Sequence, residues 1–279
     1  MGRTMVPANG VDLCVETFGD RDHPALLLIG GAASAMDWWE DDFCRRLADG
    51  GRLVIRYDHR DTGRSTAYPV GYPRYTAADL VGDALGVLDA LGIARAHVVG
   101  LSMGGGIAQR LAVEDPCRLL SVTLMSTSPG DVEEPAASSD AGGTPSDPVE
   151  TDWSDRDAAV DRLVADVIAC GGKFTADERH LRELAGRIFD RTTDMAASQT
   201  NHWLAADTGA PIRERLATIT MPALVLHGTV DPFFSMAHAQ ALAREIPGAR
   251  LVPLEDVGHE NPPAAVWDVV TAEILRHTS

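Results

Sequence analysis

Three residues that lie far apart in the chain have the side chains needed to attack a carbonyl carbon. Ser102 is the centre of a G-x-S-x-G pentapeptide, and Asp231 and His259 follow it in that order. A serine hydroxyl is a poor nucleophile until a base accepts its proton, and a third group must orient that base. The three residues predict a triad in which Ser102 is the nucleophile, His259 the base and Asp231 the orienting acid.

The serine pentapeptide lies between an apolar run, 96–99, and a helix-like stretch, 106–112. A G-x-S-x-G motif at a strand-to-helix junction is typical of a sharp turn that exposes the serine. Glycines are needed in such a turn because the strand and the helix pass close to it. The N–H groups and the positive dipole end of the helix then face a developing oxyanion. An ordinary glycine-rich turn is the alternative interpretation.

The acid of the triad has competitors in the sequence. Three further carboxylates flank His259 on its own loop, at Glu255, Asp256 and Glu260. Asp231 is preferred because it follows the apolar run 222–228. That position is the carboxyl end of a strand, where open parallel sheets bind their ligands.

The elements that must position these residues alternate between strands and helices. Apolar runs predict strands at 12–18, 25–29, 52–57, 96–101, 119–125, 222–227 and 249–254. Amphipathic helical periodicity lies between them, for example at 77–91. Continuous apolar strands separated by such helices predict an α/β fold with a mostly parallel sheet covered by helices on both faces.

After the strand that ends near residue 125 the pattern changes. The segment 131–150 is acidic, contains prolines and lacks long apolar side chains. Such a segment cannot bury enough surface to offset its ordering entropy, so we expect a mobile stretch, with a structured lid strand as the alternative. Helical patterns follow at 155–170, 176–190 and 194–206. We predict a core formed by 1–129 and 212–279, with a helical cap inserted at 130–211.

One more segment gives the chain a resemblance to a known family. Residues 58–65 read D-H-R-D-T-G-R-S, which is similar to the D-x-R-G-x-G-x-S loop of capped serine esterases in the α/β-hydrolase superfamily. With residues 26–31 and the serine pentapeptide, this loop particularly resembles the aclacinomycin methylesterases. The chain order serine, acid, histidine is also that of α/β-hydrolases. The chain departs from the pattern at Asp61, where most relatives have glycine, and the resemblance is weaker between about 130 and 210.

The resemblance implies two backbone donors for an oxyanion hole. One is the N–H of Met103, the residue after the nucleophile. The other belongs to the loop after the strand at 25–29, where alignment of the glycines indicates Gly31, with Ala32 as the alternative. Many relatives have His-Gly at this loop and this chain has Ile29-Gly30; the missing histidine bears on the support of the loop but not on its ability to donate, because the donor is a backbone N–H.

Aromatic residues predict an apolar substrate pocket. Trp203 lies on the third predicted cap helix, and Phe233 and Phe234 follow Asp231; all three are predicted to contact substrate. Further candidates for the wall of this pocket are Trp38, Trp39 and His202. An apolar pocket with few charged anchors favours methyl or short-chain esters of hydrophobic acids.

The predicted function is hydrolysis of a small-molecule carboxylic ester, without a metal or an organic cofactor. Lactone hydrolysis, amide or imino-peptide hydrolysis and perhydrolysis use the same triad, and a receptor-like protein could keep it as a binding pocket. The formal charge of −17 argues against nucleic acid and anionic membranes as partners. Four scattered cysteines predict neither a metal site nor a disulfide framework. With no apolar leader or membrane-length apolar stretch, we expect a cytoplasmic enzyme; its oligomeric state is left open.

Overall fold

One mixed sheet of eight strands forms the centre of the structure, a computed structural model that describes residues 2–130, 151–206 and 210–279. The strand order is β1-β2-β4-β3-β5-β6-β7-β8. The strands are β1 (Thr4–Ala8), β2 (Val11–Phe18), β3 (Ala25–Ile29), β4 (Leu53–Tyr57), β5 (Ala96–Leu101), β6 (Leu119–Met125), β7 (Ala223–Gly228) and β8 (Arg250–Leu254). The β1–β2 and β2–β4 pairs are antiparallel and all the other pairs are parallel.

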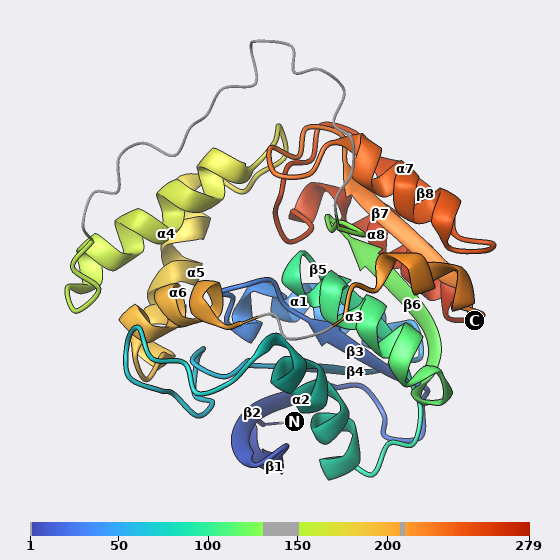
Figure 1. The fold of residues 1–279 in the computed structure, drawn as a ribbon. Coiled ribbons are helices and arrows are strands. Elements are labelled where there is room, and N and C mark those ends of the chain that lie inside the picture. The colour runs from blue at the N-terminus through green and yellow to red at the C-terminus, as the bar shows by residue number, and fades with distance from the viewer. Residues whose placement is uncertain (1, 131–150, 207–209) are drawn as a thin grey trace.

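Helices cover both faces of this sheet (Figure 1). They are α1 (Asp41–Asp49), α2 (Ala77–Ala90), α3 (Met103–Glu114), α7 (Met236–Glu245) and α8 (Trp267–His277). Shorter 3-10 turns are η1 (Met36–Trp38), η2 (Pro116–Arg118), η3 (Arg213–Thr218) and η4 (Ala264–Val266). In β3, Leu27 and Ile29 pack into the core cluster shared with α2, α3 and α7, whereas Leu26 and Leu28 pack into the cluster shared with α1 and α8. The predicted sheet is confirmed. It could be predicted because a strand that is buried on both faces is a continuous apolar run in the sequence.

The predicted strands at 25–29, 96–101 and 119–125 agree with the structure at both ends. Those at 12–18, 52–57 and 249–254 differ by one residue at their first end, and the strand predicted at 222–227 is shifted by one residue at both ends. Strand β1 is not among the predicted strands; Val6 and Ala8 are its buried residues. An Asn9-Gly10 turn with positive φ at both residues joins β1 to β2. Asn-Gly between two short strands is a recognised hairpin signal, and it could have identified this edge strand.

The three helices predicted after residue 150 are α4 (Arg156–Cys170), α5 (Glu178–Arg191) and α6 (Met195–Leu204). They lie together beside the sheet, drawn from yellow-green to orange in Figure 1. Each begins after an aspartate whose side chain accepts a backbone N–H of the first turn, at Asp155, Asp177 and Asp194. Their apolar residues form a third core cluster, apart from the two clusters on the sheet. The segment 131–150 lies outside the described residues, and the division into core and cap stays a prediction.

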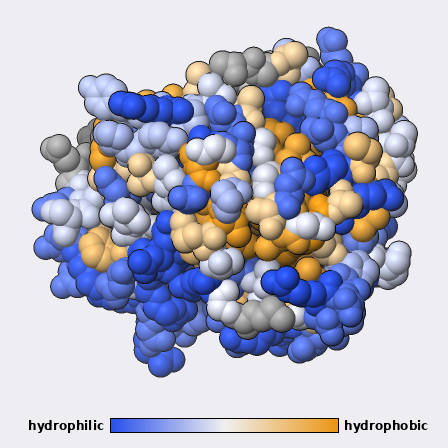
Figure 2. Space-filling view, turned by 90° about the horizontal axis from the view of Figure 1, so that it is seen from below, coloured by the Kyte–Doolittle hydropathy of each residue, from blue (hydrophilic) through white to orange (hydrophobic). Residues whose placement is uncertain are grey.

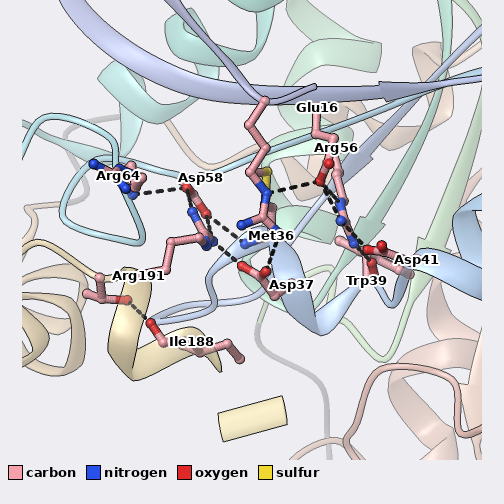
Figure 3. A network of polar contacts seen from close by, with 12 residues as sticks. Glu16, Met36, Asp37, Trp39, Asp41, Arg56, Asp58, Arg64, Ile188 and Arg191 are labelled. Atoms are coloured by element: carbon pink, nitrogen blue, oxygen red, sulfur yellow. Dashed lines mark hydrogen bonds and ion pairs between the residues drawn. The ribbon is translucent and has the colours of Figure 1, made fainter. Parts of the chain in front are cut away.

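A buried arginine ties the end of α5 to the core (Figure 3). Arg191 donates two hydrogen bonds to the Asp58 carboxylate, one of them at 2.8 Å, and forms a further ion pair with Asp37. All three side chains are buried. The backbone N–H groups of Met36 and Arg64 also donate to Asp58. Helix α5 is thus fixed to the segments that follow β3 and β4.

Figure 2 views the molecule from the side of α2 and the β1–β2 hairpin. Hydrophobic residues gather near the middle of this face, and hydrophilic residues occupy most of its margin. In the described ranges, no helix combines the length and the apolar character that crossing a bilayer requires.

Candidate active site

Ser102 lies in a strained turn between β5 and α3. Its φ is +53°, in the left-handed region that non-glycine residues rarely adopt. The Ser102 N–H donates to the Met125 carbonyl at 2.9 Å, and the Ser102 carbonyl accepts from the N–H groups of Gly105 and Gly106. The Thr127 hydroxyl donates to the same carbonyl at 2.9 Å. These hydrogen bonds stabilise a backbone conformation that is unfavourable for serine in an unconstrained chain.

The glycines of the pentapeptide are required by close contacts. A Cβ atom on Gly100 would lie 2.1 Å from the carbonyl oxygen of Gly104, and one on Gly104 would lie 2.4 Å from the carbonyl oxygen of Ile29. No side chain fits at either position without movement of the backbone. The close approach of strand and helix that the sequence predicts is confirmed, and an ordinary glycine-rich turn does not explain the strain at Ser102.

The structure brings the three predicted triad residues together. His259 Nε2 lies 3.0 Å from Ser102 Oγ, and His259 Nδ1 lies 2.8 Å from Asp231 Oδ2. Asp231 follows β7 and His259 follows β8, so both come from the carboxyl ends of neighbouring parallel strands. With Nδ1–H donating to the carboxylate, Nε2 is free to accept the serine proton.

The surroundings of Asp231 favour the ionised form of its carboxylate. Its side chain is fully buried, and its Oδ1 accepts the backbone N–H groups of Phe233 and Phe234, both at 2.9 Å. Burial by itself would raise the pKa of Asp231, but the hydrogen bond from His259 and those two N–H groups hold this pKa below its usual value. A charged carboxylate at this position favours an imidazolium next to it.

The competing acids near His259 have other partners. Glu260 Oε1 accepts from the N–H of Gly172 at 3.0 Å and from the Thr175 hydroxyl at 2.9 Å, both in the loop between α4 and α5. Asp256 is half exposed and faces Lys173. Of the carboxylates considered from the sequence, Asp231 is the one that contacts the histidine ring.

Both predicted oxyanion donors lie next to Ser102. Met103 is the first residue of α3, and the first N–H groups of a helix have no acceptor within it. A Cβ atom on Gly31 would lie 3.6 Å from the Ser102 Cβ, so the loop between β3 and η1, residues 30–35, passes beside Ser102. The choice between Gly31 and Ala32 as the second donor stays a prediction.

The predicted aromatic residues divide into two groups. The ring centroids of Phe233 and Phe234 lie 4.9 Å and 5.6 Å from that of His259, and both contacts are edge-on. Phe233 is also 59% exposed, so it leaves an apolar surface open beside His259. Trp203, at the end of α6, is 70% exposed, and its contact with substrate stays a prediction.

Three candidates for the pocket wall have different surroundings from those expected. Trp39 is buried in the core and stacks on Phe43, and Trp38 packs against the cluster of α4 and α5. His202 is buried, with its ring nitrogens hydrogen-bonded to the backbone of Ala33 and Arg60. These backbone contacts of His202 were not predicted from the sequence. The signal for them was weak, a histidine next to Asn201 on the inward side of an amphipathic helix.

Comparisons with known proteins agree with this architecture. Residues 24–262 match the model of the alpha/beta hydrolase fold family. A rhodomycin D methylesterase from a Streptomyces strain is 37% identical, and one from Streptomyces peucetius is 36% identical; each alignment covers all of this chain and 98% of the relative. The solved enol-lactonase from Burkholderia xenovorans is 27% identical with a TM-score of 0.75, over 98% of this chain and 99% of that one. The chain therefore belongs to the alpha/beta hydrolase fold family.

Proposed function

We propose that the protein is a serine hydrolase that cleaves carboxylic esters, with Ser102, His259 and Asp231 as its catalytic triad. The observation that carries this proposal is the continuous hydrogen-bonded path from the Asp231 carboxylate through the His259 ring to the Ser102 hydroxyl. The strained φ of Ser102 supports it, because such strain persists where the surrounding structure holds a functional group in place.

The geometry suits a two-step reaction through an acyl-enzyme. Ser102 Oγ attacks the ester carbonyl carbon while His259 Nε2 takes the hydroxyl proton, and the carbonyl oxygen becomes an oxyanion bound by the N–H groups of Met103 and Gly31. Collapse of this intermediate breaks the bond to the alcohol, which leaves with the proton from His259. Water then attacks the acyl carbon and gives one proton to His259. Collapse of this second intermediate breaks the bond between the acyl carbon and Ser102 Oγ, which takes the proton back from His259 as the acid is released.

We infer that the substrate is a methyl or short-chain ester of a bulky hydrophobic acid. The exposed ring of Phe233 beside His259 supports an apolar acyl group. The full-length similarity to two rhodomycin D methylesterases supports a small leaving alcohol. In this proposal α4, α5 and α6 form the cap that contributes to substrate choice, and Trp203 is its aromatic contact with substrate.

Lactone hydrolysis is the second candidate. It is favoured by the similarity to the enol-lactonase structure and by a 3-oxoadipate enol-lactonase that is 26% identical over 85% of this chain. A lactone carbonyl presents the same atoms to Ser102, but its leaving alkoxide stays attached to the acyl group.

A substrate panel with an inactive variant tests the proposal. Wild-type protein should hydrolyse methyl esters of polycyclic aromatic acids faster than matched lactones and anilides. Ser102→Ala should lower kcat by several orders of magnitude without a change in melting temperature, because triad members act as a unit. A fluorophosphonate probe should label the wild type at Ser102 and leave the variant unlabelled. Labelling that persists in the variant, or turnover of anilides above every ester, would overturn the assignment.

A further inference from the structure

The loop between β3 and η1, residues 30–35, needs support from outside itself. It carries Gly31 and Ala32, the two candidates for the second oxyanion donor, and Ala33 follows them with a φ of +58°. A non-glycine residue in this region is strained and keeps its conformation when surrounding groups enforce it. Within the loop, the Ser34 N–H lies 3.4 Å from the Gly31 carbonyl oxygen, a long hydrogen bond.

Helix α6 holds both backbone polar groups of Ala33. The Ala33 N–H donates to His202 Nδ1 at 2.8 Å. The side-chain amide of Gln199 donates to the Ala33 carbonyl at 3.2 Å. Gln199 and His202 are three residues apart, so they lie on one face of the helix.

The second ring nitrogen of His202 fixes its tautomer. Nε2 lies 2.9 Å from the carbonyl oxygen of Arg60, which can only accept, so Nε2 carries the proton. Nδ1 is then an acceptor, as the Ala33 N–H requires. Burial is the main reason why the pKa of His202 is lowered to about 4, and the neighbouring His59 adds to it. The ring is therefore neutral near pH 7 and presents one acceptor to the loop.

The other end of the same loop also rests on a buried histidine. His59 Nε2 lies 3.1 Å from the Gly30 carbonyl oxygen, and the rings of His59 and His202 meet edge to face with centroids 5.7 Å apart. His59 comes from the segment after β4, whereas His202 comes from the proposed cap.

We propose that His202, assisted by Gln199, is a positioning residue for the oxyanion hole. It acts through the Ala33 backbone and sets the direction of the preceding N–H groups, without contact with the substrate. This inference rests on the proposed ester hydrolysis and adds to it a link between α6 and transition-state stabilisation. Misplacement of a catalytic group by about 1 Å can cost about 100-fold in rate, and loss of one oxyanion donor costs about 100- to 1,000-fold.

Substitution of His202 tests this role. His202→Phe keeps a ring of similar size but removes the acceptor at Nδ1 and the donor at Nε2. We expect kcat to fall about 10- to 100-fold, with KM little changed, because the ground-state ester makes little use of the hole. His202→Asn keeps an acceptor close to the Nδ1 position and should recover most of the lost kcat. Gln199→Met removes the weaker of the two contacts and should lower kcat less.

A reversible inhibitor separates positioning from a merely structural effect. A trifluoromethyl ketone adds to Ser102 and forms a bound oxyanion, so its affinity should fall by the same factor as kcat/KM in each variant. Active enzyme is counted by fluorophosphonate titration. The matched control is His97→Phe, which replaces a buried histidine hydrogen-bonded to Ser121 on β6, and it should keep the wild-type kcat.

The outcomes distinguish this inference from the proposed function. A wild-type protein without activity on any ester would overturn the proposed function. An active wild type with an equally active His202→Phe variant would overturn the role of His202 alone. A loss of kcat that His202→Asn does not restore, with unchanged ketone affinity, would show that His202 supports only the fold. If His202→Phe does not fold, a Gln199→Met variant with wild-type kcat and ketone affinity would overturn the inference.

Discussion

The two carboxylate oxygens of Asp231 contact different groups. Oδ2 contacts His259 Nδ1 at 2.8 Å, whereas Oδ1 accepts the N–H groups of Phe233 and Phe234. The backbone therefore fixes the carboxylate, and the carboxylate fixes the ring. An amide at this position would keep the shape of the side chain but would lose the charge that favours the imidazolium.

Asp231→Asn should lower kcat by about 10,000-fold, the size of effect seen when a triad histidine is left in the wrong tautomer. The measurement is single-turnover acylation by a nitrophenyl ester, with circular dichroism to show that the fold is kept. Asp256→Asn and Glu255→Gln are the matched controls, because these carboxylates lie on the histidine's own loop. A nearly silent Asp231→Asn together with a severe loss in either control would mean that the acid is misassigned.

Asp61 explains why this chain departs from the family pattern at that position. Its φ is +66°, in the left-handed region that favours glycine. Here the carboxylate accepts from the Tyr68 N–H at 2.6 Å, the Tyr75 hydroxyl at 2.7 Å and the Asn201 amide at 3.0 Å. These three hydrogen bonds offset the strain and tie the segment after β4 to α6.

Among the helices, α5 shows how the proposed cap is fixed to the core. Arg191 sits between the Asp58 and Asp37 carboxylates, and all three groups are buried. Removing the cation would leave the buried Asp58 carboxylate without its ion-pair partner, whereas Asp37 would keep Arg3, which lies 2.7 Å from its Oδ1. Loss of one partner of a buried ion pair typically costs about 3–5 kcal/mol of stability.

Arg191→Met should therefore lower the midpoint of urea unfolding strongly, and it should loosen α5 before the sheet. Hydrogen exchange read by mass spectrometry would show faster exchange in 178–204 than in the core strands. The matched control is Arg156→Met, which breaks an exposed pair with Asp190 on the same helices and should change stability little. Equal effects of the two substitutions would contradict the anchoring role of Arg191.

The positions of the three triad residues could be predicted because each has a local signal in the sequence. Ser102, Asp231 and His259 each follow a buried strand, and parallel strands bring their carboxyl ends to one edge, so the site could be assembled without coordinates. The contacts of Arg191 with Asp58 and of His202 with Ala33 join residues 133 and 169 positions apart. Neither contact has a local signal, because the packing of α5 and α6 against the loops depends on the whole fold.

The molecule as a whole buries several histidines that its chemistry does not use directly. Burial is the main reason why the pKa values of His59, His97 and His202 are each lowered to about 4. In the unfolded chain a histidine has a pKa of about 6.5. Between these values the unfolded chain binds more protons than the folded one, so the free energy of unfolding must decrease as pH falls from about 6.5 towards 4.

Urea unfolding at pH 7.5, 6, 5 and 4.5 should therefore show a plateau near neutral pH and a decline below about 6.5. Each such histidine contributes at most about 1.4 kcal/mol per pH unit within the window. His97→Gln removes one titrating group, so it should reduce the slope of the free energy of unfolding against pH by the contribution of one proton. It should leave kcat unchanged, because His97 contacts Ser121 in the sheet. The lowered pKa of Asp231 acts in the same direction, but its contribution is lost only when pH falls below its ordinary value of 3.8. Stability that stays constant or rises between pH 6.5 and 4.5 would show that these histidines are protonated in the folded state.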